Sequence, residues 1–490
     1  MRFGLKQTVL ATFAFSSILF LCGCDAEPVT SLCWSPDGER GALDIPGQGI
    51  RLVGPEGEKS LTDILLPDAI SFAWENDKNH LLAVTEKNEK DWGKLKELID
   101  KEEQTKIFET TQEILRLQKK YGSLKSEDGI PKEDSEKIKT MIKEIRLGDV
   151  LTYMFSVDPA ALATFMKEND KKADEWSCPV YSLKRYSVKK NSIEAESTIC
   201  TTRETLQEYA TSPNGKAVAV VSSKNWGDPM PNYLKLYPSS GGVPQIVDEF
   251  DGDRGSIAWL AENNWLFSTD FKEITGRKTM DDDGNLIEKP AAEFFLEAEG
   301  VGRIVCRNKN QIFFSAPKVT YPGPIGQSQG PHSLFMLRPT ETWAPAEILN
   351  GTLNGNCKDF DISPDGKSIA TMQEDGKVDL VKMRDMEGGT IQEIPFAKEQ
   401  AKASRILPRF RNNDELSFCV PVKLEEPEAS EKSDKAKADK PAPKAAELVI
   451  YSIKSGKSRT ISKSWTSEVA PFLKKYVEKK DESSDEKQEN

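Results

Sequence analysis

A repeated turn sequence constrains the fold of this chain more than any other feature. Three copies occur, WSPDG at 34–38, TSPNG at 211–215 and ISPDG at 362–366, and each runs into an apolar or alternating stretch. Proline presets the first inner turn position, Asp or Asn accepts local amide bonds, and Gly supplies the left-handed residue that closes a hairpin. Each copy therefore predicts a tight hairpin that opens a β-unit.

Weaker copies of the same turn-then-strand order fill the intervals between these three. They lie at 74–79, 259–264, 307–310 and 411–414. About seven units result, and all steps but one are near the roughly 40 to 50 residues of a four-stranded propeller blade. The sequence predicts an all-β fold over residues 29–464, a β-propeller of about seven four-stranded blades, with six or eight blades as open alternatives. A pair of β-sandwiches with coincidental turns is another alternative.

The WSPDG and ISPDGK turns, each followed by a β-run, resemble the repeat of TolB-like, WD40-like propellers of the bacterial cell envelope. The resemblance covers most of residues 29–464 and implies the propeller fold. Such propellers host many activities, so the resemblance does not fix the chemistry.

One step between units is longer than the others and contains residues 89–176. Trp92, Leu95 and Ile99 fall on one helical stripe, and the apolar residues of 138–145 follow the i, i+3, i+4, i+7 spacing of an amphipathic helix. A third, more apolar helix is predicted from about 149 to 167. We therefore expect an α-helical insertion in the second blade, either as a small subdomain or as a decoration with its own minor core.

The N-terminus has the pattern of an export signal. A cationic start precedes an uncharged run at 9–21, and the sequence LCGC at 21–24 resembles a bacterial lipobox. This resemblance implies a lipoprotein signal peptide at 1–23, a lipidated tether at 24–28 and acylation of Cys24, for example with palmitate. Acyl chains would anchor the protein to a membrane from its outer or periplasmic side. An ordinary secretory signal is the alternative.

The charge balance limits the partners of the body. The chain has 79 acidic and 67 basic residues and a formal net charge of -12. Nucleic acid requires concentrated Lys and Arg, so we expect no nucleic-acid partner. Six cysteines follow Cys24, and the sequence does not choose among their possible pairings.

Longer connections indicate a candidate binding face. The helical insertion and the segments 226–233, 271–290, 318–331 and 424–446 are all expected between the second and third strands of their blades. Such loops share one rim of a propeller, and loops on a rigid scaffold commonly carry function. Trp226 and Tyr233 are the candidate binding residues of this rim. Residues 424–446 are also predicted to be a disordered loop, and 467–490 a charged tail.

Signals of catalysis are weak. Residues 326–330 match Gly-x-Ser-x-Gly with His332 nearby, but this is a Gly/Pro loop without the strand and helix that a nucleophile elbow needs. His80 and His332 are the only histidines, which excludes a multi-histidine zinc centre. The acidic run 281–285 lacks the ligand spacing of an EF-hand. We predict no catalytic, cofactor-binding or metal-binding residue.

These observations favour a membrane-anchored cell-envelope lipoprotein whose propeller binds a protein or peptide. One alternative is an enzyme that acts on a glycan or peptide through the central funnel. Another is a structural spacer that displays the helical insertion.

Overall fold

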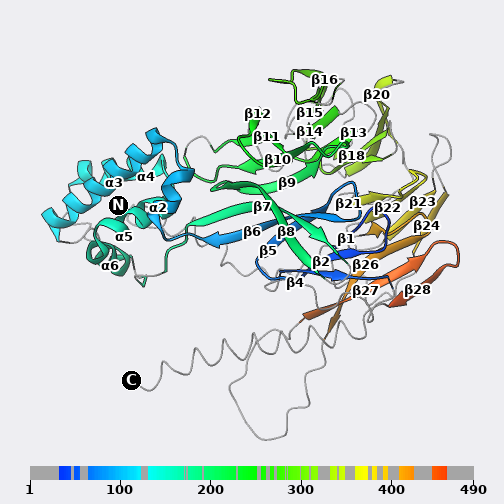
Figure 1. Cartoon of the computed structure of the whole chain (residues 1–490), viewed down its shortest axis with the longest axis horizontal. Coiled ribbons are helices and arrows are strands. Elements are labelled where there is room, and N and C mark those ends of the chain that lie inside the picture. Colours follow the sequence, from blue (N-terminus) through cyan, green and yellow to red (C-terminus); the bar gives the residue numbers. More distant parts are fainter. Residues whose placement is uncertain are drawn as a thin grey trace, which may run out of the picture.

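The described residues form seven four-stranded antiparallel sheets and one group of helices (Figure 1). In this computed structural model each sheet consists of four strands that are consecutive in the sequence. The predicted all-β propeller with a helical insertion in its second blade is therefore confirmed. The structure describes residues 32–460, with gaps at 46–48, 56–64, 123–130, 170, 173–174, 190–191, 228–229, 251–254, 261–264, 270–272, 282, 284, 298–299, 308–310, 318–331, 339–341, 348–358, 373–377, 383–389, 395–407 and 424–443.

The first three blades occupy the N-terminal half. Their strands are β1 (Leu32–Trp34), β2 (Gly41–Ile45), β3 (Gly49–Val53) and β4 (Leu65–Leu66); β5 (Ala69–Trp74), β6 (His80–Asn88), β7 (Pro179–Val188) and β8 (Ile193–Thr202); and β9 (Thr205–Thr211), β10 (Ala217–Ser223), β11 (Asn232–Pro238) and β12 (Gln245–Phe250).

Four more blades follow. Their strands are β13 (Ile257–Leu260), β14 (Trp265–Thr269), β15 (Glu273–Lys278) and β16 (Ala292–Glu297); β17 (Ile304–Arg307), β18 (Gln311–Pro317), β19 (His332–Arg338) and β20 (Thr342–Glu347); β21 (Asp359–Ile362), β22 (Ser368–Met372), β23 (Val378–Lys382) and β24 (Thr390–Glu393); and β25 (Arg409–Phe410), β26 (Glu415–Lys423), β27 (Lys444–Ser452) and β28 (Lys457–Thr460).

The three strong turn repeats adopt the same hairpin. In the first, the Ser35 N–H donates to the carbonyl of Arg40 at 2.7 Å, and the Ser35 hydroxyl donates to Asp37 at 2.7 Å. The turns at 212 and 363 repeat both bonds. The glycines have φ values of 71°, 72° and 71°, in the left-handed region that favours glycine. The predicted hairpins are confirmed, and they join the first and second strands of their blades.

The hydrophobic core is divided among the interfaces between blades. Six clusters of buried side chains each draw on two neighbouring blades, from the first and second to the sixth and seventh. Most of the side chains are Val, Leu, Ile, Ala, Phe and Tyr from both sheets. Stability of the ring therefore comes mainly from face-to-face packing of successive sheets, as expected for repeat architectures.

Tryptophans near the ends of inner strands join neighbouring blades. The Trp74 indole N–H donates to the carbonyl of Cys33 at 3.0 Å, and the Trp259 indole N–H donates to the carbonyl of Ala210 at 3.1 Å. Cys33 and Ala210 occupy the same position in their repeats, two residues before the serine of the turn. The two bonds are therefore one contact repeated at different blades.

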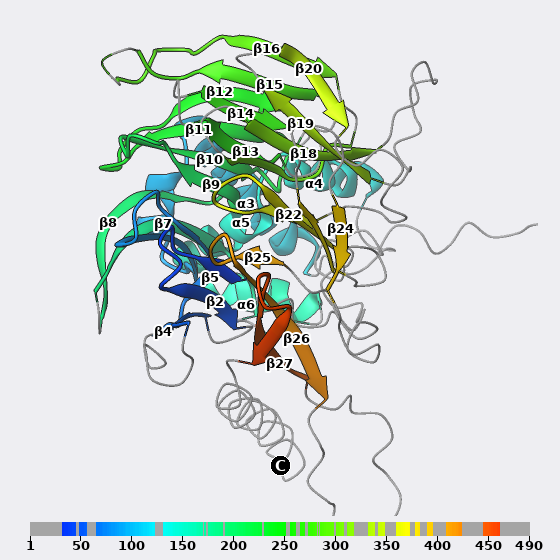
Figure 2. The ribbon, with the colours of Figure 1, turned by 90° about the vertical axis from the view of Figure 1, so that its right-hand side faces the viewer.

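The ring closes through a variant of this contact. The Trp34 indole N–H donates to the Ser417 hydroxyl at 2.6 Å, and that hydroxyl donates to the carbonyl of Arg409 at 3.0 Å. The Arg411 side chain also donates to the carbonyl of Gly38 at 2.6 Å. Figure 2 shows the blue first blade beside the orange last blade, in accord with the contact between β1 and β25. The closure uses side chains rather than a shared strand.

The insertion contains more breaks than predicted. It comprises α2 (Trp92–Leu95), η1 (Lys96–Leu98), α3 (Lys101–Tyr121), α4 (Lys132–Lys143), α5 (Leu147–Val157) and α6 (Pro159–Glu168). The continuous third helix is wrong, because the Asp158 carboxylate accepts the N–H of Ala161 at 2.9 Å and caps a new helix that begins with Pro159. Asp100 caps α3 in the same way, by accepting the N–H of Glu103 at 2.8 Å.

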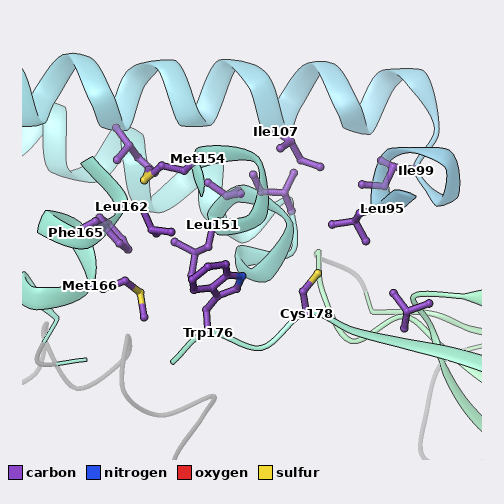
Figure 3. Close-up of a cluster of buried hydrophobic side chains, with 14 residues drawn as sticks. Leu95, Ile99, Ile107, Leu151, Met154, Leu162, Phe165, Met166, Trp176 and Cys178 are labelled. Atoms are coloured by element: carbon purple, nitrogen blue, oxygen red, sulfur yellow. The ribbon is translucent and has the colours of Figure 1, made fainter. Parts of the chain in front are cut away.

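The insertion has its own hydrophobic core. Side chains from α3, α5 and α6 converge on Trp176 in the segment that returns to β7 (Figure 3). Ile107, Ile114 and Met154 are fully buried there. None of the helices in the part of the chain that the structure describes is long and apolar enough to cross a membrane.

One expected rim loop was assigned to the wrong rim. Residues 271–290 were expected between the second and third strands of their blade, but the third strand, β15, already begins at Glu273 and ends at Lys278. The polar side chain of Arg277 is buried in β15, since Asp248 of the preceding blade pairs with it at 2.5 Å. The connection that follows, 279–291, therefore lies between the third and fourth strands, where Lys216 Nζ donates to the carbonyl of Asp283 at 3.1 Å.

Several other expectations concern residues outside the described ranges. These are the signal peptide 1–23, the tether 24–28 with Cys24, the segment 318–331, the loop core 424–443 and the tail 467–490. The C-terminal boundary of the predicted loop 424–446 is wrong, because β27 begins at Lys444 and pairs with β26.

Candidate binding rim

The strand order defines two rims. The tight hairpins at 35–40, 212–216 and 363–367 lie on one rim, which we call the turn rim. The helical insertion follows β6 and the connection 224–231 follows β10, so both lie at the opposite ends of antiparallel second strands. We call this second side the insertion rim. Figure 1 shows the helices beyond the ends of β6 and β7.

Buried charges fasten the insertion to this rim. Arg203, which connects β8 and β9, pairs through one guanidinium nitrogen with Asp149 of α5 and through another with Glu103 of α3 at 2.5 Å. Asp149 is fully buried and Arg203 is 5% exposed at its side chain. The four residues Glu103, Asp149, Arg203 and Trp226 form what we call the junction cluster.

Trp226 belongs to the junction cluster rather than to an exposed binding surface. Its indole N–H donates to Glu103 at 2.8 Å, and the Arg203 guanidinium lies 4.8 Å from its ring centroid. The ring is buried, with 7% of the residue exposed. Trp226 therefore packs under the insertion, and its predicted role as an accessible contact is not supported by its position.

The charges of the junction cluster also control a nearby thiol. Burial raises the pKa of Asp149, while the guanidiniums of Arg203 and Arg146 oppose this. The Cys178 thiol donates to Asp149 at 3.1 Å, and burial followed by the Asp149 charge raises the pKa of Cys178 to about 12. Cys178 is thus a protonated structural thiol and not a nucleophile. Cys178 and Cys200 are both buried, and neither forms a disulfide within the described residues.

Tyr233, the second predicted binding residue, lies in β11 rather than in a loop. It is partly exposed, and the ammonium of Lys235 lies 4.9 Å from its ring centroid. Lys235 pairs with Glu204 at 2.5 Å, which holds this cation in place. Tyr233 is therefore an accessible ring beside a fixed charge pair.

The insertion carries a series of aromatic side chains that the sequence analysis did not single out as a surface. Tyr153 lies between Trp92, with ring centroids 4.9 Å apart, and Phe108, at 6.0 Å. Phe155 packs on Trp176 at 5.3 Å. Phe108 is 48% and Phe155 43% exposed, although both are large and apolar. The sequence did contain a signal for these exposed rings. Phe108 and Phe155 lie next to the buried residues of α3 and α5 and are not among them.

A pocket of about 580 Å³ lies between Trp92 and Phe155, at the junction of β6 with the insertion. We call it the aromatic pocket. It is a shallow hollow that is open to solvent rather than an enclosed cleft. Asn88 in its lining is held in place, because its side chain donates to the carbonyl of Trp176 at 3.2 Å and accepts the N–H of Cys178 at 2.6 Å. It is lined by Asn88, Glu89, Lys90, Asp91, Trp92, Phe155 and Ser156.

Polar side chains on the inner strands connect blades. Glu208 accepts the N–H of Ile257 at 3.1 Å and the hydroxyl of Ser256 at 3.2 Å, both on the next blade. Burial raises the pKa of Glu208 to about 7. Asp361 likewise accepts the N–H of Phe410 at 2.8 Å. These carboxylates therefore hold neighbouring blades together.

A possible metal-binding group lies at the weak turn repeat of the second blade. One ligand atom each from Glu75, Asp77 and His80 lies within 4.8 Å of the others. Glu75, however, already accepts from Arg185 at 2.7 Å and from Thr211 at 3.0 Å. Asp77 accepts the N–H of His80 at 2.9 Å. These hydrogen bonds explain why the three side chains lie close together: they stabilise the hairpin of the second blade.

The expected absence of a serine nucleophile is not tested. Ser328 and its surroundings lie outside the described residues, and His332 begins β19.

Comparisons with known proteins find only distant similarities. No protein-family model and no curated protein matches the sequence. The sheet order by itself identifies the fold of the described residues as a β-propeller. Among solved structures the chain is similar to TolB from Acinetobacter baumannii, with 13% identity, a TM-score of 0.35 and 57% of this chain covered. The chain spans 58% of that structure and 65% of the C-terminal WD40 domain of Sif2.

Two further solved structures are covered over most of their length. Kluyveromyces lactis Hsv2 has 9% identity and a TM-score of 0.43, with 88% of this chain and 98% of Hsv2 covered. A functionally unknown protein from Desulfotomaculum acetoxidans has 10% identity and a TM-score of 0.40, with 89% and 95% covered.

Proposed function

We propose that this protein is a membrane-anchored lipoprotein of the cell envelope whose propeller is a scaffold for binding a protein or peptide. The observation that carries the binding role is the aromatic pocket on the insertion rim. Trp92 and Phe155 offer large rings around a hollow, and such rings concentrate binding energy at interfaces. The carboxylates of Glu208 and Asp361 are engaged between blades, which accords with a scaffold rather than with catalysis.

The anchor is proposed from the lipobox-like sequence that ends at Cys24. Acyl chains on this cysteine hold the protein on the membrane, because each buried CH₂ contributes roughly 0.8 kcal/mol and two or three chains make a stable anchor. The test is fractionation of Cys24→Ala with labelling by palmitate. We expect the variant to leave the membrane fraction and to lose the label. Retention in salt-washed membranes would contradict the anchor.

The binding role is tested by capture from detergent-solubilised membranes with the mature protein as bait. Phe155→Ser and Phe108→Ser remove exposed rings on the insertion rim, whereas Val243→Ser changes a residue that is 89% exposed in the connection between β11 and β12, on the turn rim. We expect the first two variants to lose the captured protein at unchanged melting temperature and the third to retain it.

Two outcomes would change the assignment. Loss of capture by Val243→Ser, with the phenylalanine variants unaffected, would move the binding face to the turn rim. The originally predicted residues give a further comparison: Trp226→Ala should reduce stability and capture together because Trp226 is buried, whereas Tyr233→Ala should affect capture without unfolding.

A further inference from the structure

The first strand places the N-terminus on the insertion rim. β1 runs from Leu32 to Trp34 directly into the tight hairpin at 35–40, so it begins at the rim opposite that hairpin. The insertion leaves the ring at the end of β6, on that same rim. β1 and β6 belong to adjacent blades, whose strands β1 and β5 are in contact. A tether attached before β1 therefore reaches the ring beside the insertion.

The length of that tether limits the distance to the membrane. Eight residue steps separate Cys24 from Leu32, and a fully extended chain spans at most roughly 3.3–3.6 Å per residue, or about 26–29 Å in all. α3 alone has 21 residues and is about 31 Å long at 1.5 Å per residue. The insertion is thus as long as the longest possible tether, and a ring held from Cys24 keeps its insertion close to the bilayer surface.

A site at a bilayer surface can bind either lipid headgroups or a membrane protein. The chemistry of the aromatic pocket distinguishes between these two ligands. Helices that bind lipid headgroups present a continuous apolar face bordered by many Lys and Arg. The aromatic pocket is instead a shallow, open hollow, and its lining has two carboxylates, Glu89 and Asp91, against one ammonium, Lys90. The Glu89 pKa is lowered by its hydrogen bond with Lys87 although burial opposes this, so the carboxylate stays ionised. Aromatic rings beside these carboxylates fit an apolar side chain next to a basic one.

We propose that the aromatic pocket binds a segment of an integral membrane protein, exposed on the same side of the membrane and carrying an apolar side chain beside a basic residue. This inference rests on the proposed anchor at Cys24, because the anchor brings the insertion rim to the membrane. Tethering also raises the effective concentration of such a partner without any additional contact. At this raised effective concentration, a contact that is weak by itself is sufficient for binding.

The test is photo-crosslinking in membranes of the native host. Phe155→p-benzoylphenylalanine places the reactive group at the pocket wall, and Val243→p-benzoylphenylalanine is the matched control on the turn rim, where the native side chain is 89% exposed. We expect the first variant to give an adduct with a protein that stays in the membrane after alkaline extraction. The adduct should be at least tenfold weaker from position 243. Adding Cys24→Ala should weaken the adduct at 155 severalfold.

Other results would overturn the inference. An adduct of Phe155→p-benzoylphenylalanine with phospholipid would show that the pocket faces lipid, and an adduct with a protein removed by alkaline extraction would show a soluble partner. No adduct above the control would show that the pocket is unoccupied. Failure of the anchor is seen separately, as the unsubstituted protein in the soluble fraction. Equal folding of both variants is checked by circular dichroism.

Discussion

Removal of the Arg203 guanidinium is the sharpest test of how the insertion is held. Arg203→Met keeps a long apolar stem over Trp226 but withdraws the cation from Asp149 and Glu103. Glu103 keeps its bond from the Trp226 indole at 2.8 Å. Asp149, which is fully buried, keeps the hydrogen bond from the Cys178 thiol at 3.1 Å, and the one cation left beside it is Arg146 at 4.0 Å. The variant thus leaves one buried carboxylate poorly compensated.

The magnitude follows from that imbalance. Removing one partner of a buried ion pair typically costs about 3–5 kcal/mol. Because Arg146 remains beside Asp149, we expect the lower end, about 3 kcal/mol at neutral pH. Burial already raises the pKa of Asp149, and loss of Arg203 raises that pKa further. Protonation is then favoured in the folded state, so the lost stability returns as pH falls through the raised pKa toward the ordinary value of roughly 4.

The assay is urea unfolding followed at 222 nm, a wavelength that emphasises the helices, which among the described residues all belong to the insertion. We expect the helical signal to be lost at lower urea in Arg203→Met, and at pH 5 the difference from wild type should shrink. The matched control is Arg203→Met with Asp149→Asn, which removes the stranded charge and should recover part of the loss. An unchanged midpoint in Arg203→Met, or a difference that grows at low pH, would refute the role given to the buried pair.

Three further outcomes are expected. Trp34→Phe removes the indole hydrogen bond at the ring closure and should lower the free energy of unfolding by about 1 kcal/mol. Trp74→Phe, which removes the equivalent bond between the first two blades, is the control and should have the same effect. An effect of Trp34→Phe near zero would contradict the closure contact. Because the pKa of Glu208 is raised to about 7, wild-type stability should fall as pH rises from about 4.5 toward 7 and then level off, and Glu208→Gln should flatten this part of the profile in thermal melts. Excision of residues 91–175 should leave cooperative unfolding of the β-body. Arg203→Ser and Trp226→Ser are added so that the excision does not expose the guanidinium and the indole ring. Loss of cooperativity would show that the insertion belongs to the core of the β-body.

Repetition made the ring predictable from sequence. The turn at 34–38 needs Pro, Asp and Gly at fixed places, so three copies indicate both the hairpins and the spacing of the blades. The helical insertion was also accessible, because its apolar spacing differs from that of strands. Its subdivision was not foreseen, since Asp158 and Pro159 sit inside an otherwise helical pattern.

Contacts between segments far apart in the sequence could not be predicted. Arg277 reads as a polar loop residue until Asp248 of another blade pairs with it. Trp226 reads as an exposed ring until Glu103, 123 positions away, accepts its indole N–H. In both cases burial of a polar or amphipathic side chain depends on a partner that local patterns do not reveal. The aromatic pocket was missed for the same reason, because Trp92 and Phe155 line one hollow only after the helices fold.

The bond between Trp34 and Ser417 joins residues 383 positions apart. At the roughly 5–20 residues per second of ribosomal synthesis, on the order of 20–80 s separates the appearance of the two. During that interval the first blade has no seventh blade to cover its face. The seam between the ends of the chain is therefore the last interface to form, and in a nascent or truncated chain it is the apolar surface most open to chaperones and to wrong pairing with another copy.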